Sequence, residues 1–212
     1  LLPETLYLSI NIIDRFLSLR VVSVPKLQLV GITAMFIASK YEEVIAPSIQ
    51  NFIYMADGGY TEEEILKAER YMLQVLDFSL QYPSPMSFLR RCSKADNYDI
   101  QTRTLAKYFM EISLLDNKFL DITSSMIAAA SMYLARVVLD RGNWDKNLIH
   151  YSGYKESELL HPVSLILNYI RTPRTQEALY KKYASRKYMR IAVYVSNWVA
   201  KGNIVPSIDN AI

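Results

Sequence analysis

Apolar residues recur at spacings of three and four along most of the chain, the period of a helix that buries one face. Alternation of apolar and polar residues between hairpin turns, which would indicate strands, is absent. The pattern therefore predicts an all-α protein. The predicted helices lie at about 5–19, 26–41, 48–56, 61–76, 84–92, 100–117, 124–141, 145–151, 155–170 and 175–185, with a further one at 186–199.

Two of these segments are apolar on every side. Residues 27–39 contain no charged side chain, and neither do residues 122–135. A helix that is apolar all round must be buried all round. We therefore expect two helical bundles, each wrapped around one central helix.

An internal repeat supports two bundles of similar design. Gly59–Ile65 returns as Gly153–Leu159, Met35–Ala38 as Met132–Ala135, and Ile13-Asp14 as Leu115-Asp116. Pro83 and Pro85 interrupt the helical pattern between the two copies. We expect a first domain at 1–80, a second at 81–172 and a basic helical tail at 173–212.

Composition excludes several classes of protein. Cys92 is the single cysteine and there are two histidines, which leaves no disulfide framework and no cysteine-based zinc cluster. No apolar stretch approaches the ~20 residues that a membrane-spanning helix needs, so we expect no membrane contact. Because the chain starts at Leu1 rather than Met, we expect it to be a fragment.

No group of residues resembles a catalytic or cofactor site. Cys92 has no identifiable histidine partner, and the neighbouring Glu42 and Glu43 are of a kind common on solvated helix ends. His150 and His161 have no clustered metal ligands around them. We therefore expect no enzyme activity, no cofactor and no metal site.

Two charged residues interrupt apolar stripes. Lys40 continues one face of the helix at 26–41, and Glu69 lies within the stripe of the helix at 61–76. An unpaired charge in apolar surroundings is costly, so each is the obvious partner of the other. The repeat places Val137 and Val163 at the matching positions, so the bundle does not need this pair. The pair is either an ordinary ion pair between helices or a polar anchor at a partner interface.

The net charge of +3 is unevenly distributed. Residues 171–212 carry eight Lys or Arg and two acids, which gives +6 and leaves −3 for the rest. Tyr180, Tyr183 and Tyr188 lie among these basic residues. This arrangement is compatible with single-stranded nucleic acid binding and with the packing of a terminal helix. The helical spacing of the tyrosines favours packing.

Several segments of the sequence together resemble the cyclin box. They are Leu27-Gln28-Leu29-Val30-Gly31, Ala38-Ser39-Lys40-Tyr41-Glu42-Glu43, Tyr60-Thr61, Glu69 and Leu76-Asp77-Phe78. The segments 88–94 and 108–116 resemble mitotic B-type cyclins, those of fungi above all. The resemblance extends to about Tyr169 and implies two tandem five-helix cyclin folds. A Met-Arg-x-Ile-Leu helix, which begins the first fold in the family, is absent here, so the resemblance implies an N-terminally truncated cyclin.

This resemblance implies a non-catalytic regulatory subunit of a cyclin-dependent serine/threonine kinase that acts at G2/M, in the nucleus and cytoplasm. It implies that Lys40 and Glu69 hold the mobile helix of the kinase. The other contact positions that it implies are Tyr41, Glu42, Leu73 and Phe78. Leu27 and Gln28 match half of a groove for Arg-x-Leu substrates or inhibitors, and we expect the missing helix to weaken that docking.

A second function belongs to a different class. Transcription factors of the TFIIB type reuse cyclin folds and carry basic surfaces that contact DNA. Residues 1–170 are net acidic here and the basic residues lie in the tail. The charge distribution therefore does not favour nucleic acid as a partner.

Overall fold

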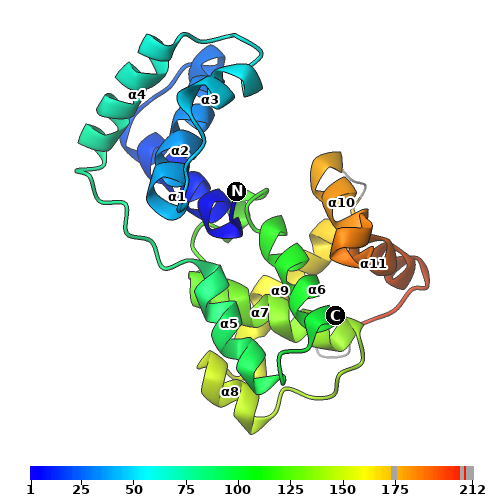
Figure 1. Ribbon diagram of the computed structural model, residues 1–212. Helices are drawn as coiled ribbons and strands as arrows, with labels where there is room; N and C mark the ends of the chain where they lie inside the picture. Colours follow the sequence, from blue (N-terminus) through cyan, green and yellow to red (C-terminus); the bar gives the residue numbers. More distant parts are fainter. Residues whose placement is uncertain (173–175, 206–207, 209–212) are drawn as a thin grey trace. The chain divides into compact units, whose positions relative to one another are not determined.

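The computed structural model describes residues 1–172, 176–205 and 208, and this part of the chain is all-α (Figure 1). The prediction of an all-helical chain is thereby confirmed. The α-helices are α1 (Pro3–Leu19), α2 (Leu27–Glu42), α3 (Ile49–Met55), α4 (Glu62–Val75), α5 (Pro85–Ala95), α6 (Ile100–Ile112), α7 (Ser124–Val138), α8 (Lys146–Ser152), α9 (Glu156–Arg171), α10 (Glu177–Ala184) and α11 (Ile191–Ala200). Short 3-10 turns are η1 (Val24–Lys26), η2 (Asn117–Phe119) and η3 (Arg186–Tyr188).

The chain divides into two compact units, residues 1–84 and 85–212. Helices α1 to α4 form the first unit, and α5 to α11 lie in the second. The domain bounds expected from the sequence stay a prediction. In the structure α10 and α11 pack on helices of the second unit, against α6 and α9.

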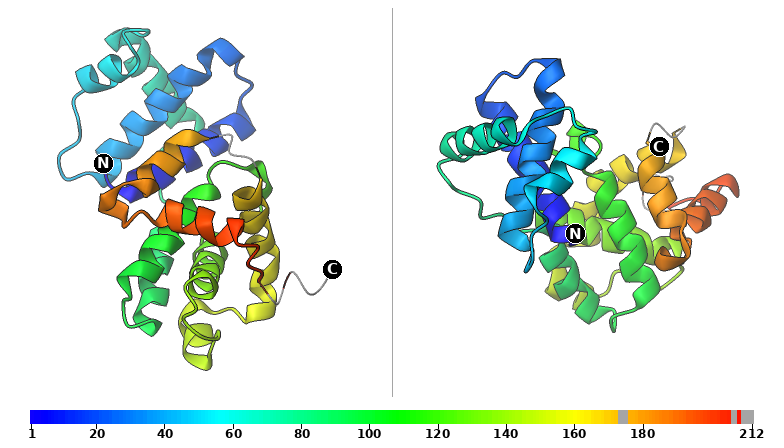
Figure 2. Two further views of the ribbon diagram at one scale, coloured as in Figure 1. Left: turned by 90° about the vertical axis from the view of Figure 1, so that its right-hand side faces the viewer. Right: turned by 45° about the horizontal axis from the view of Figure 1, so that its top comes forward.

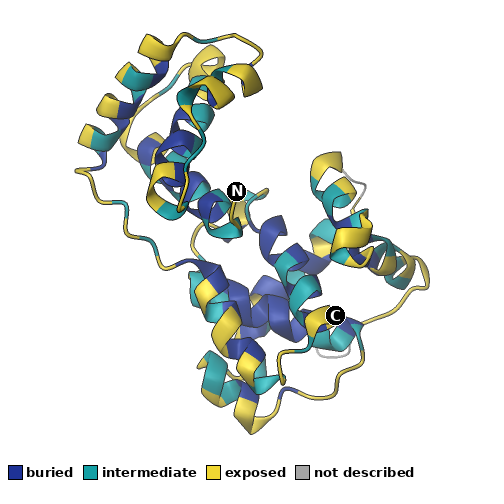
Figure 3. Cartoon of the chain, viewed as in Figure 1, coloured by how far each residue is buried: buried dark blue, intermediate teal, exposed yellow. Residues whose placement is uncertain are grey.

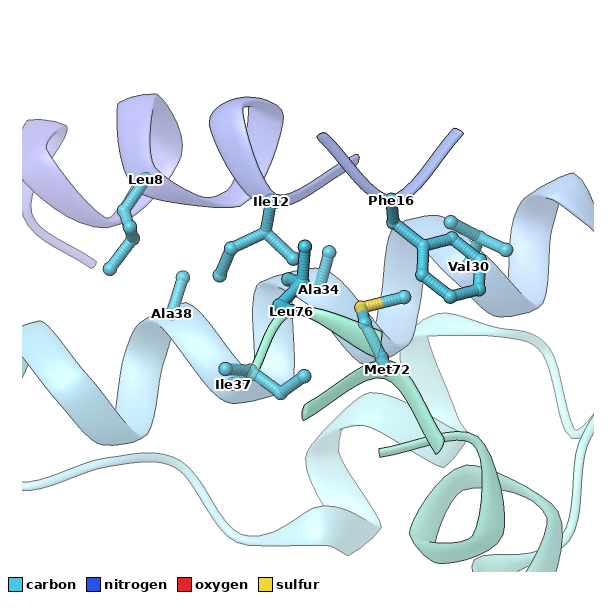
Figure 4. Packing of buried hydrophobic residues seen from close by; sticks show 9 residues of the cluster. All are labelled: Leu8, Ile12, Phe16, Val30, Ala34, Ile37, Ala38, Met72 and Leu76. Atoms are coloured by element: carbon cyan, nitrogen blue, oxygen red, sulfur yellow. The ribbon is translucent and has the colours of Figure 1, made fainter. Parts of the chain in front are cut away.

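Helix α2 is the centre of the first unit. It packs against α1 and α4, and residues 33–39 within it are mostly buried (Figure 3). Figure 4 shows the main cluster of buried side chains between these three helices. Its members are Leu8, Ile12, Phe16, Val30, Ala34, Ile37, Ala38, Met72 and Leu76. The uncharged run therefore predicted the central helix correctly, but not its burial on every side, because Leu27 and Gln28 at its start are exposed.

Helix α7 has the same role in the second unit. It packs against α5, α6 and α9, and the residues from Ile127 to Ala135 are all buried. The repeat pairs α1 with α6, α2 with α7 and α4 with α9. In each unit the central helix packs against the other two members of these pairs, α1 and α4 on α2, and α6 and α9 on α7.

The tail is fastened to α6 by a buried carboxylate. Glu111 is 6% exposed and accepts hydrogen bonds from Lys182 Nζ at 2.7 Å and from the Tyr183 hydroxyl at 2.5 Å. The Tyr183 ring is buried between Tyr108 and Tyr188. Helices α10 and α11, orange to red in Figure 2, pack against each other and against α6. These tyrosines pack the tail, as their helical spacing favoured.

Two helix ends differ most from the prediction. The helix expected at 100–117 ends at Ile112 and is followed by η2, because the carboxylate of Asp116 accepts the Lys118 amide and starts a new turn. The helix expected at 186–199 begins only at Ile191. Met189 and Arg190 before it have φ of 53°, the left-handed region, which breaks helical continuity.

The predicted start of α4 has the expected capping geometry. The Glu64 amide donates to the Thr61 hydroxyl at 3.2 Å, and the Thr61 amide donates to the Glu64 carboxylate at 2.8 Å. Gly58, with φ of +69°, ends the preceding helical turn in a conformation that glycine adopts at little cost. This junction sets where α4 begins and therefore where Glu69 lies.

Candidate functional site

The structure brings Lys40 and Glu69 together as the sequence pattern predicted. Lys40 is in the last turn of α2, Glu69 is in the middle of α4, and their side chains form an ion pair. The two partners differ in exposure: the Glu69 side chain is 10% exposed and the Lys40 side chain 44%. Lys40 Nζ also lies 4.0 Å from the centroid of the Phe36 ring, a cation–π contact. The pair therefore has one end in the core and one end in solvent.

Large apolar side chains are exposed on these same elements. Tyr41 follows Lys40 and is 55% exposed. Phe78 follows the end of α4 and is 66% exposed, with Asp77 and Phe78 both in the left-handed region at φ of 51° and 54°. Such backbone costs roughly 1–2 kcal/mol per residue. Leu73, one turn after Glu69, is partly buried against the core cluster.

The sequence interpretation missed two residues of this surface. Val44 and Ile45 follow α2 directly and are 99% and 88% exposed. Folding usually buries branched apolar side chains of this kind, and each fully buried one contributes roughly 1.5–3 kcal/mol. The feature of the sequence that could have indicated them is the placement of two branched apolar residues in a short loop directly after Glu42-Glu43.

Glu42 and Glu43 have different surroundings. Burial, with Glu4 and Glu43 nearby, raises the pKa of Glu42. Hydrogen bonds from the Thr5 hydroxyl and the Leu2 amide, both 2.6 Å from Glu43 Oε1, lower the pKa of Glu43. Glu43 therefore ties the start of α1 to the end of α2 in the ionised form.

The second unit is built differently at the matching place. Val163 is fully buried there and Val137 is partly buried. Helix α11 packs on α9, and the Tyr194 hydroxyl donates to the Val138 carbonyl at 3.3 Å. In the second unit, a helix of the same chain therefore reaches the corresponding end of the central helix through one hydrogen bond.

Leu27 and Gln28, the residues matched to a docking groove, lie at the opposite end of α2. Leu27 is 42% exposed and Gln28 is exposed as well. At 1.5 Å per residue, Gln28 and Lys40 are separated by about 18 Å along the helix. The structure therefore does not bring these two residues into one site with the ion pair.

Other chemistry finds little support in the described part of the chain. No described helix is both long and apolar enough to cross a membrane. No group of three or more His, Cys, Asp or Glu among these residues is placed to hold a metal ion. The Cys92 thiol is buried, which raises its pKa to about 11 and makes it a poor nucleophile.

Comparisons with known proteins cover the whole chain. The family model described as "Cyclin, N-terminal domain" matches residues 1–81, and "Cyclin, C-terminal domain" matches residues 83–197. Over 211 residues the chain is 63% identical to the G2/mitotic-specific cyclin cdc13 of Schizosaccharomyces pombe, covering 100% of this chain and 44% of that protein. It is 56% identical to the G2/mitotic-specific cyclin-B of Emericella nidulans, covering 95% of this chain and 42% of that protein.

A solved structure agrees at the level of the fold. A viral cyclin from herpesvirus saimiri superposes with a TM-score of 0.69 and 19% identity, covering 78% of this chain and 74% of the other. These two relatives are fungal mitotic cyclins, and the chain spans less than half of the length of each. With both domain models matched in order, this chain belongs to the cyclin family.

Proposed function

We propose that this chain is the regulatory subunit of a cyclin-dependent serine/threonine kinase and acts at G2/M without catalytic activity of its own. The similarity to fungal G2/mitotic cyclins supports this function and does not favour a TFIIB-type DNA-binding module. The observation that carries the proposal is the half-exposed Lys40–Glu69 pair beside exposed apolar side chains.

The geometry suits a helix of the kinase as the bound element. The last carbonyls of a helix lack partners within it, and the exposed ammonium of Lys40 can donate to them. Glu69 holds that ammonium in place from the core side. Tyr41, Val44 and Phe78 would supply apolar area around the polar contact.

The second unit supports the same interpretation. There the polar pair is replaced by valines, and the chain's own α11 packs on α9 and reaches the corresponding end of the central helix through the Tyr194 hydroxyl. The first unit, all of whose residues are described, has no such helix of its own. A partner helix on this face would fill the same position. A cyclin that binds the active conformation of the kinase more tightly than the inactive one shifts the equilibrium toward the active conformation. The size of the shift is set by the difference between the two affinities.

The test uses the valine pair that the second unit already contains. Lys40→Val/Glu69→Val should fold, because apolar replacement of a buried ion pair is often neutral or stabilising. The variant should bind a mitotic cyclin-dependent kinase at least thirty-fold more weakly, roughly 2 kcal/mol. Calorimetric titration measures the affinity, and histone phosphorylation measures activation of the kinase.

Lys67→Val is the matched control, since Lys67 is an exposed lysine on another face of α4. It should leave kinase affinity within twofold of the wild type. A folded valine-pair variant that still binds and activates the kinase normally would refute the assignment of this site.

A further inference from the structure

The first unit contains a cavity of about 550 Å³ between the end of α1, the segment 21–30 and α4. Its floor is apolar: Phe16, Val30 and Met72 are 4%, 8% and 1% exposed. Figure 4 shows these three side chains together at one end of the core cluster. The volume lies in the range of sites that bind ligands through a few large apolar groups.

The mouth of this cavity is predominantly basic. Lys26 and Lys67 both line it and are exposed, and neither forms an ion pair within the part of the chain that the structure describes. Glu64, whose carboxylate accepts the Thr61 amide in the capping box of α4, also lines it, so the lining carries two cations and one anion. At the rim, Arg20 Nε donates to the Tyr71 hydroxyl at 3.1 Å. The mouth is therefore complementary to negative charge.

Exposed apolar side chains extend the cavity along the loop after α1. Val21, which lines the cavity, is fully exposed, and Val24 nearby is 79% exposed. Leu19 at the end of α1 is 52% exposed. Exposed apolar side chains beside a charged cavity mouth are typical of a surface that binds a protein segment.

The cavity lies on a different side of α4 from the kinase-binding residues proposed above. Lys67 and Tyr71 are each two positions from Glu69, which places them about 200° around the helix. Glu69 points toward Lys40, whereas Lys67 and Tyr71 line the cavity. A ligand in the cavity therefore leaves the Lys40–Glu69 face free.

We propose that this cavity is a docking site for an acidic peptide segment of a partner protein, separate from the kinase site. One or two bulky apolar side chains of the segment would enter above Phe16 and Met72. Neighbouring carboxylates would pair with Lys26 and Lys67. Charge complementarity at the mouth selects acidic over basic segments, and apolar burial supplies most of the affinity.

The test uses a displayed library of random 16-residue peptides selected on the full 212-residue chain. Enriched peptides are made singly, and their affinity is measured by fluorescence anisotropy at two salt concentrations. Three variants probe the site: Lys26→Glu/Lys67→Glu reverses the charge of the mouth, Val21→Asp alters the exposed rim, and Arg70→Glu reverses a neighbouring charge outside the cavity. Circular dichroism checks that each variant is folded.

We expect the enriched peptides to combine Leu, Phe, Met or Trp with Asp or Glu. Lys26→Glu/Lys67→Glu should weaken their binding at least tenfold and Val21→Asp at least fivefold. Arg70→Glu and the valine pair Lys40→Val/Glu69→Val should stay within twofold of the wild type. Enrichment without acidic residues, equal binding to the charge-reversed mouth, or loss of binding in the valine-pair variant would each overturn the proposal.

Discussion

Removing either partner of the Lys40–Glu69 pair should have unequal effects on stability. Lys40→Ala leaves the nearly buried carboxylate of Glu69 without its cation. Glu69→Ala leaves an ammonium that is 44% exposed and still in contact with the Phe36 ring. Water can solvate the unpaired Lys40 ammonium but hardly reaches the unpaired Glu69 carboxylate, so Lys40→Ala should be the more destabilising change.

The magnitudes follow from where the pair lies. Breaking a fully buried pair costs about 3–5 kcal/mol, and an exposed pair contributes about 0–1 kcal/mol. With one buried and one half-exposed partner, we expect about 2 kcal/mol for Lys40→Ala and about 1 kcal/mol for Glu69→Ala. The double variant should cost clearly less than the sum, because the second substitution removes the group that the first had orphaned.

Urea unfolding at pH 7 measures these differences, with circular dichroism as the signal for both units. Both tryptophans, Trp144 and Trp198, lie in the second unit, so their fluorescence should follow that unit alone. It provides an internal control: the substitutions should shift the dichroism transition and leave the fluorescence transition in place. Equal costs for the two alanines, or strictly additive costs, would refute the asymmetry argued from exposure.

Three further predictions concern other parts of the chain. Tyr183→Phe removes a hydrogen bond to the buried Glu111 carboxylate and should lower the stability of the second unit by about 1.5–3 kcal/mol, seen in tryptophan fluorescence during urea unfolding; an unchanged midpoint would contradict it. Cys92, buried and with its pKa raised to about 11, should not react with a thiol reagent at pH 8 until urea unfolds the chain, and rapid reaction of folded protein would be the opposite result. The hydrogen bond from the Thr5 hydroxyl lowers the pKa of Glu43 below its ordinary 4.5, so the stability that ionised Glu43 contributes is complete above about pH 4.5 and is lost as the pH falls through the lower pKa of the folded state. The difference in urea midpoint between the wild type and Glu43→Gln should therefore shrink from pH 7 to pH 3. A difference that widens would refute the role of ionised Glu43.

Much of the architecture could be read from local patterns. Apolar periodicity predicted helices because burial on one face at a period of 3.6 is a local property of sequence. The uncharged runs at 27–39 and 122–135 predicted the central helices α2 and α7, and Thr61 with Glu64 predicted the start of α4. Helix ends were less predictable where backbone conformation decided them, as at Met189 and Arg190.

The candidate site could be predicted only in part. Lys40 and Glu69 break apolar stripes, and two opposite charges in such places need each other, so their pairing followed from sequence alone. Their unequal exposure did not follow, since it depends on how α2 and α4 cross. Val44, Ile45 and Phe78 are exposed although apolar side chains are usually buried, and this exposure is known only from the fold.

Spacing within a segment or between repeats was enough to predict the helices, the two repeated bundles and the opposite charges that form a pair. Tertiary packing set α11 against α6 and α9 and left the Lys40 end of α2 without a helix of this kind. It also formed the cavity at Phe16, Val30 and Met72. Both features arise where helices distant in sequence meet, and local periodicity does not encode which of their faces remain uncovered.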